Sequence, residues 1–107
     1  MLAIISPSKT QDFSTCDCEA FSQTRQIEDS KELVAILRGK NEVQIAKLMS
    51  LSEKLAKLNF DRFQNFQTPF TLENAKQAMF AFKGDTYVGL DADTMNSSEI
   101  KFAQDHL

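Results

Sequence analysis

The sequence predicts an α+β fold that is predominantly helical and contains a few short strands. Between residues 31 and 66, apolar residues recur three or four positions apart, which is typical of amphipathic helices. Two short apolar runs, at residues 2–5 and 79–82, have the length of buried strands. The chain has 107 residues, of which 42% are hydrophobic and 25% charged. These values indicate a single globular region over residues 1–107 and exclude a disordered or fibrous chain.

The first expected element is a short buried strand, Leu2–Ile5, which stops at Ser6-Pro7. Residues 10–26 show no clean periodicity, so we expect a loop or an irregular crossing segment there. This segment holds the only two cysteines, Cys16 and Cys18. Because a single residue separates them, a disulfide would require a strained ring, and we expect two free thiols.

Helices are expected through the middle of the chain. Ser30 can cap the first of them, and Gly39 is a typical stop. The three expected helices are residues 31–38, residues 41–49, and a third that opens at the capping hydroxyl of Ser52 and stops at residues 67–69. The third carries an aromatic stripe that we expect to pack into the core. The residues of this stripe and of the segment that follows it are Phe60, Phe63, Phe66 and Phe70.

The last third of the chain is expected to alternate short helices and strands. The expected elements are a helix capped by Thr71 and running to Ala78, a strand at Met79–Phe82, a strand or extended segment at Thr86–Leu90, and a last helix capped by Ser97 or Ser98. No stop signal follows the last helix. We therefore expect the sequence to end inside a periodic segment.

Charge is unevenly distributed along a chain whose net charge is −3. Residues 1–30 carry −3, residues 31–83 carry +4 and residues 84–107 carry −4. A basic middle of this kind can present phosphate-binding lysines, although solvated helix faces are the simpler interpretation. No apolar run approaches the ~20 residues of a membrane span. Residues 1–5 lack the basic start of a signal peptide, so we expect a cytoplasmic protein without a membrane partner.

Two polar clusters follow the expected strands and could carry chemistry. In residues 6–10, Ser-Pro-Ser-Lys-Thr, hydroxyls, backbone N–H groups and a lysine could converge on an anion, but the glycines of a P-loop are absent. In the second cluster, Gly84 lies between Lys83 and Asp85, which suits close approach of a ligand. A β-turn with solvated charges explains the second cluster equally well.

Residues 48–56 match the spacing of a helix-hairpin-helix element, which would extend over about residues 41–66. In such a hairpin, backbone N–H groups and the positive end of the second helix point at a DNA phosphate without reading sequence. The matching residues are Ser50, Leu51 and Ser52 at the hairpin and Lys47, Lys54 and Lys57 as nearby cations. Serines replace both glycines of the motif, and a plain helical hairpin packed into the fold is the alternative.

Several motifs in register resemble the YaaA peroxide-stress family. They are residues 2–10, the run from Leu48 to Phe63, the blocks at residues 70–78 and 81–90, and residues 102–107. Residues 11–31, the cysteines included, have no counterpart. The resemblance implies that the chain is the N-terminal part of a larger mixed α/β fold. We therefore expect a truncated chain whose missing C-terminal half is a partner and which can self-associate.

The resemblance also implies a function. Members of this family are cytoplasmic bacterial proteins that keep unincorporated iron low under hydrogen peroxide stress and so limit Fenton damage to DNA and protein. A member binds DNA through a helix-hairpin-helix element beside a positive cleft. By position, this role falls on the hairpin residues named above, whereas the polar motifs that could line the cleft are Ser6, Lys9, Thr10, Lys83, Gly84, Asp85 and Tyr87. The resemblance brings no catalytic reaction or catalytic residue.

Two alternatives remain open. In the first, Lys9, Lys83, Asp85 and Tyr87 form an anion or nucleotide pocket of an enzyme or binding protein. In the second, the protein sequesters iron, but one histidine, His106, and a sparse cysteine pair do not predict a metal site. We expect no cofactor.

Overall fold

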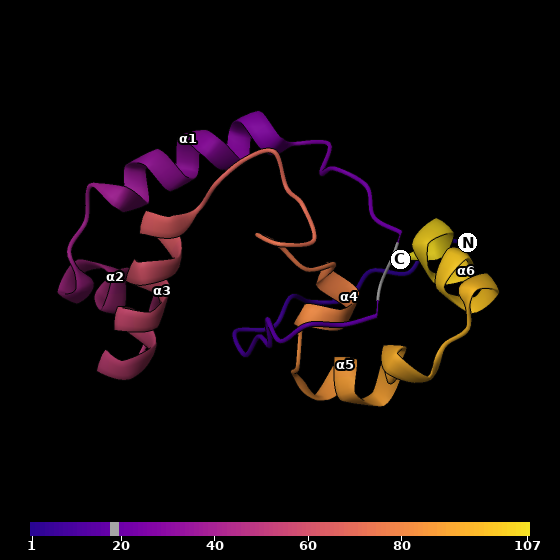
Figure 1. Ribbon diagram of the computed structural model, residues 1–107. Helices are drawn as coiled ribbons and strands as arrows, with labels where there is room; N and C mark the ends of the chain where they lie inside the picture. The colour runs from indigo at the N-terminus through magenta and orange to yellow at the C-terminus, as the bar shows by residue number, and fades with distance from the viewer. Residues whose placement is uncertain (18–19) are drawn as a thin grey trace. The chain divides into compact units, whose positions relative to one another are not determined.

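The computed structural model describes residues 1–17 and 20–107, which form helices joined by long irregular segments (Figure 1). The helices are α1 (Ile27–Arg38), α2 (Glu42–Met49), α3 (Glu53–Asn65), α4 (Ala78–Ala81), α5 (Asp85–Leu90), the 3-10 helix η1 (Ala92–Thr94) and α6 (Ser97–His106). The chain divides into two compact units. Unit 1 comprises Met1–Phe21 and Thr71–Leu107, and unit 2 comprises Ser22–Phe70.

The predicted α+β class is wrong, because the described residues contain no β-sheet. Their only β pairing is an isolated antiparallel bridge between Gln11 and Phe82. Residues 79–81 belong to α4 and residues 86–90 to α5, and Leu2–Ile5 has no strand partner. Runs of four or five apolar residues are too short for periodicity to separate strand from helix.

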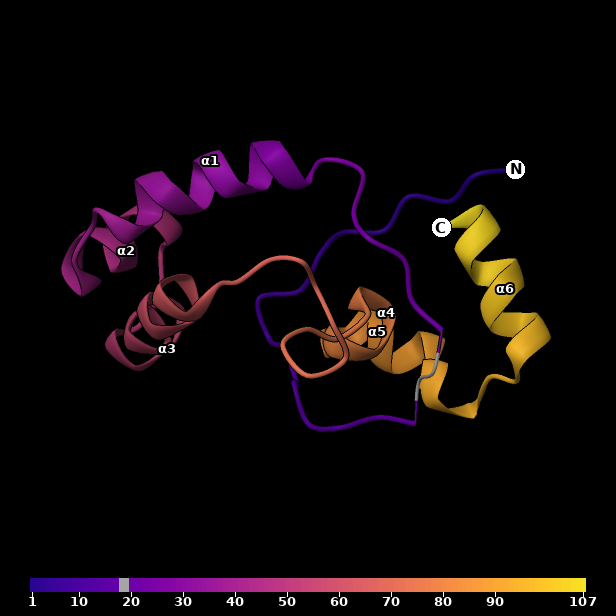
Figure 2. The ribbon, with the colours of Figure 1, turned by 45° about the horizontal axis from the view of Figure 1, so that its top comes forward.

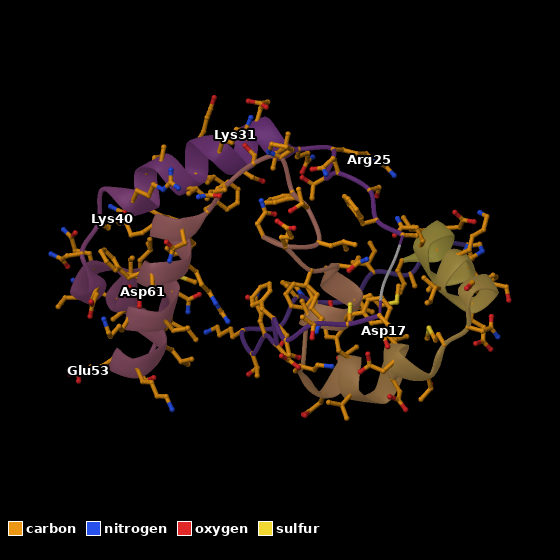
Figure 3. All side chains as sticks on the ribbon, in the orientation of Figure 1. Asp17, Arg25, Lys31, Lys40, Glu53 and Asp61 are labelled. Atoms are coloured by element: carbon orange, nitrogen blue, oxygen red, sulfur yellow. The ribbon has the colours of Figure 1, made fainter. Side chains whose placement is uncertain are left out.

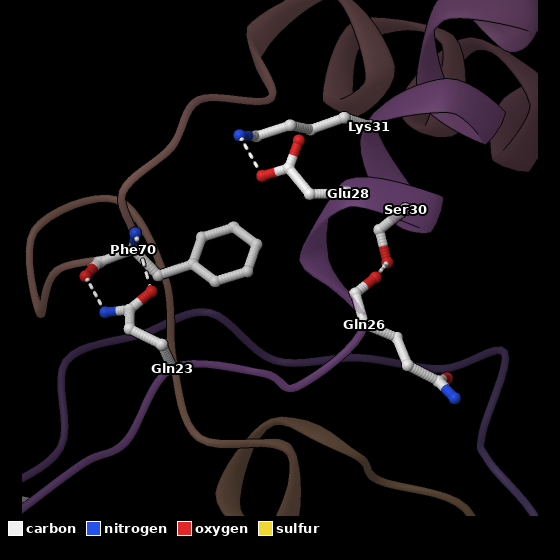
Figure 4. A network of polar contacts seen from close by, with 6 residues as sticks. All are labelled: Gln23, Gln26, Glu28, Ser30, Lys31 and Phe70. Carbon is white, nitrogen blue, oxygen red and sulfur yellow. Dashed lines mark hydrogen bonds and ion pairs between the residues drawn. The ribbon is translucent and has the colours of Figure 1, made fainter.

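Unit 2 confirms the helices that the sequence predicts. Asn41 caps α2 in a reciprocal box with Gln44, and Ser52 caps α3. The first helix begins at Ile27, four residues earlier than expected. Ser30 therefore lies inside α1, where its hydroxyl donates to the carbonyl of Gln26 at 3.1 Å instead of capping (Figure 4).

Polar contacts close unit 2 at both ends of its chain segment. The side-chain amide of Gln23 donates to the carbonyl oxygen of Phe70 at 2.7 Å and accepts from its N–H at 3.2 Å (Figure 4). The expected aromatic core is only partly formed, since Phe60, Phe63, Phe66 and Phe70 are half-buried. The buried residues of the unit are Val34, Ile45 and Ala56.

Unit 1 contains short helices around an irregular N-terminal segment, as expected for residues 10–17. The predicted helix from Thr71 to Ala78 is absent. Thr71 instead begins a turn, in which its N–H donates to the side chain of Asn74 at 2.8 Å. The last helix is confirmed, but its cap is Asn96, with Glu99 as reciprocal partner, and not Ser97 or Ser98.

The prediction of free thiols is wrong for Cys16. Cys16 is disulfide-bonded, so it carries no free thiol. Cys18 lies outside the described residues. Within the described ranges, no helix has the length and apolarity needed to cross a membrane.

Candidate functional site

The connection between α2 and α3 contains one residue in the left-handed conformation. Ser50, which stands where the motif has its first glycine, adopts the left-handed conformation with φ 52° and ψ 52°. The following N–H, of Leu51, donates to the carbonyl of Ala46 at 2.9 Å and closes the end of α2. A serine therefore holds the turn for which glycine is normally used.

Ser52 organises the start of α3. Its hydroxyl oxygen accepts from the N–H of Leu55 at 3.4 Å, and its carbonyl accepts from the N–H of Ala56 at 2.8 Å. Among the described residues, no group accepts from the N–H groups of Glu53 and Lys54. These two donors at the positive end of the helix are available to an anion.

Packing fixes the two helices of the hairpin side by side, as Figures 1 and 2 both show. Ile45 of α2 is fully buried, and Ala56 of α3 is 1% exposed. A small side chain at the contact lets the helix axes approach closely. The hairpin is therefore a defined part of unit 2, and this packing is also what the plain-hairpin alternative requires.

The three lysines of the hairpin differ in their partners. Lys57 Nζ lies 3.8 Å from a Glu42 oxygen and 3.9 Å from an Asp61 oxygen, so its charge is partly neutralised. Lys47 and Lys54 are exposed and form no ion pair with any described acidic group. Glu53, labelled in Figure 3, is the first residue of α3 and adds a negative charge at the start of this helix. The cations best placed for a phosphate are thus Lys47 and Lys54.

The two polar clusters, far apart in sequence, meet within unit 1. The N–H of Lys83 donates to the carbonyl of Thr10 at 3.0 Å, and the Tyr87 hydroxyl donates to the carbonyl of Ser6 at 3.0 Å. At Gly84, an added Cβ would lie 2.9 Å from the hydroxyl oxygen of Ser8. This close approach explains why a glycine is needed there, and the main role of the contacts is to join the two segments.

A cavity of about 200 Å³ lies beside this junction. Its described lining includes Lys83 and Tyr87 but neither Lys9 nor Asp85. The Lys83 ammonium lies 3.4 Å from Asp93, a lining residue that carries no signal in the sequence. The cavity is smaller than the ~300–1,000 Å³ of typical ligand sites, and its one lysine is already paired. Asp85 begins α5 and is exposed.

No group of three or more potential metal ligands occurs within residues 1–17 and 20–107.

The fold and its sites define a helical protein with a basic two-helix hairpin and a junction of polar motifs. The family described as peroxide stress protein YaaA matches residues 1–107. The chain therefore belongs to the YaaA peroxide stress protein family, which confirms the resemblance and supports a general role in peroxide stress.

Curated relatives agree with this assignment. A UPF0246 protein of Aliivibrio fischeri strain MJ11 is 50% identical over the whole chain. UPF0246 proteins of Shewanella amazonensis and Alteromonas mediterranea are 45% and 44% identical over the same extent. In each case the chain spans 42% of the length of the relative.

Proposed function

We propose that this chain is part of a cytoplasmic peroxide-stress protein that binds the backbone of duplex DNA, without reading sequence, through the α2–α3 hairpin. The observation that carries the proposal is the left-handed conformation of Ser50. It is the conformation that glycine adopts most readily, at the position where the motif has its first glycine. In addition, the N–H groups of Glu53 and Lys54 at the start of α3 have no acceptor among the described residues. Backbone donors at a helix N-terminus suit a phosphate oxygen.

The distribution of charge supports the same surface. Unit 2 contains eight Lys and Arg against six Asp and Glu, although the whole chain is net acidic. With Lys47 and Lys54 as the main cations, about two phosphates would be neutralised, which predicts a salt dependence with a slope of about −2 in log K against log salt. Binding by this chain alone is therefore expected to be weak.

A charge-reversal experiment tests the proposal. Fluorescence anisotropy with two duplexes of unrelated sequence measures the binding constant over a series of salt concentrations. Lys47→Glu with Lys54→Glu should weaken binding at least about 10-fold and flatten the salt slope, equally for both duplexes. The matched control is Arg25→Glu with Lys31→Glu. It changes the charge of unit 2 by the same amount, but near the start of α1 instead of at the hairpin (Figure 3).

The control variant should retain binding within about 3-fold, since its side chains are outside the hairpin. Equal losses in both variants would show a general charge effect and contradict the hairpin. A strong preference for one duplex would contradict binding without sequence readout.

We propose that the cellular role includes keeping unincorporated iron low and limiting Fenton damage to DNA and protein. The family description, which concerns peroxide stress, supports this role. Cells that lack the full-length gene should show more chelatable iron by electron paramagnetic resonance after a peroxide challenge. If these cells are sensitive to peroxide but their iron signal is unchanged, this part of the proposal is contradicted.

A second candidate is a site for a small phosphate compound, favoured by the cavity that Lys83 and Tyr87 line. An anion would have to displace Asp93 from Lys83, so this candidate is the weaker one. Calorimetric titration with inorganic phosphate tests it. Saturable binding that persists at high salt and disappears in Lys83→Ala would favour it, and an absence of heat would eliminate it.

A further inference from the structure

One surface of unit 1 combines the first residues of the chain with α6. The N–H of Ala3 donates to the carbonyl of His106 at 2.6 Å, and His106 Nδ1 lies 2.8 Å from the carbonyl oxygen of Met1. Figures 1 and 2 both place the start of the chain beside the last turn of α6. Residues 1–5 are thereby fixed along the helix even though they form no strand.

The side chains on this surface are large, apolar and open to solvent. Met1 is fully exposed and Ile4 is 91% exposed, while Leu2 and Phe102 are exposed over about two thirds of their area. The Phe102 ring contacts the His106 ring in a tilted arrangement, with 4.1 Å between the ring centroids. This contact connects Phe102 to the residue that holds Met1. We refer to Met1, Leu2, Ile4 and Phe102 as the α6 apolar surface. Large exposed apolar side chains on neighbouring segments often belong to an interaction site.

The surface is also held in place at its other end. Just beyond Ile4, the carbonyl of Ser6 accepts the hydrogen bond of the Tyr87 hydroxyl at 3.0 Å. The segment is therefore anchored to α6 at residues 1 and 3 and to α5 at residue 6. A fixed segment loses less conformational entropy when a partner covers it.

The side chains of the surface and its neighbours argue for an apolar partner. The neighbouring ionic groups on α6, Lys101 and Asp105, pair with each other at 2.8 Å. The four side chains of the surface itself carry no charge. Their burial is therefore the main source of binding energy available there.

We propose that the α6 apolar surface docks the part of a full-length family member that lies outside these 107 residues. The curated relatives give this occupant its size, because the chain spans only 42% of the length of each of them. When only one side of an intramolecular interface is present, its apolar side chains are exposed to solvent. The exposed residues on α6 and on the anchored first segment fit this description. This inference is independent of DNA binding.

Co-expression tests the inference without requiring the second part to be stable alone. The tagged chain is produced in one cell together with the unmatched part of the Aliivibrio fischeri relative, and in parallel with those of the Shewanella and Alteromonas relatives. We expect a co-purified complex with one copy of each part, measured by sedimentation. Ile4→Asp with Phe102→Asp should reduce the recovered partner about 100-fold or more, because two buried apolar contacts are replaced by charges.

Two further variants keep the result interpretable. Leu2→Asp with Ile4→Asp leaves the sequence of α6 unchanged and should cause a comparable loss, while circular dichroism confirms that the helices persist. Leu33→Asp with Val43→Asp places the same charges on exposed apolar positions of unit 2 and should retain the complex. Absence of a complex with all three relatives, a complex that survives both surface variants, or a symmetric dimer of the chain through this surface would each overturn the inference.

Discussion

Ser50 holds a backbone conformation that costs an L-residue about 1–2 kcal/mol relative to the right-handed helix. Glycine avoids most of this cost, so we expect Ser50→Gly to raise the free energy of unfolding by about 0.5–1 kcal/mol. Urea denaturation measures the change. The matched control is Ser97→Gly in the first turn of α6, where the same substitution should destabilise by a few tenths to about 1 kcal/mol. Equal effects in the two variants would contradict the interpretation.

The carboxylate of Asp105 titrates next to a lysine. The hydrogen bond from Lys101, at 2.8 Å, and the attraction of its charge lower the pKa of Asp105 below its ordinary value. Because the folded pKa is lowered, the contribution of this pair to stability is present above the pKa of the unfolded chain. It is lost as the pH falls through the folded pKa.

NMR titration of the Asp105 carboxyl should therefore give a midpoint below the ~3.9 of an unperturbed aspartate. Lys101→Met should return the midpoint toward that value. Both groups are exposed, so the accompanying change in stability is expected to be small. An unchanged midpoint in Lys101→Met would show that the lysine is not the cause.

Two helices of unit 2 are joined mainly by the side chain of Arg38, while the side-chain amide of Gln64 donates to the Arg38 carbonyl at 3.3 Å. Arg38, at the end of α1, donates to the carbonyl oxygens of Phe63, Gln64 and Phe66 at 2.8, 3.2 and 2.6 Å. Because α3 ends at Asn65, these carbonyls lack the N–H donors that a longer helix would supply, although the Phe63 carbonyl also accepts from the N–H of Phe66 at 3.4 Å. Arg38→Lys keeps the charge but loses the planar fork of donors, so we expect a loss of about 1–2 kcal/mol in the free energy of unfolding.

Urea unfolding followed by far-ultraviolet circular dichroism measures this loss. Lys31→Arg on the exposed side of α1 is the matched exchange and should stay within about 0.5 kcal/mol of the unaltered chain. If Arg38→Lys is equally neutral, the three carbonyl contacts do not stabilise unit 2.

At the scale of elements, helix length and capping decided which predictions were correct. The helices α2 and α3 have sustained periodicity. Ser52 caps α3 as predicted, and Asn41, the expected start of α2, is the cap of that helix. In unit 1, Asn96 caps α6 ahead of the predicted serines, because its side chain accepts from two N–H groups while Glu99 returns a bond. Several residues there could cap, and only the geometry of the turn selects one.

The whole molecule has a small core for its length. Among the described residues, the buried ones are Val34, Ile45, Ala56, Phe80, Ala81, Ala92 and Ala103. Four of these are alanines, which contribute little apolar area. We therefore expect a free energy of unfolding below about 5 kcal/mol, at the low end for native domains, and urea denaturation with a linear extrapolation measures it. A value above about 8 kcal/mol would contradict this reading of the core.

Sequence by itself determined the family, the three helices of unit 2 and the position of the hairpin. Each rests on local information, since a helix of eight or more residues carries its own periodicity and caps. Tertiary structure alone decided that Met79–Ala81 is helical, that Lys83 pairs with Asp93, and that Gly84 lies against Ser8. The conformation of a short apolar run and the partner of a single charge depend on residues that are distant in the chain. The local sequence pattern contains no information about those residues.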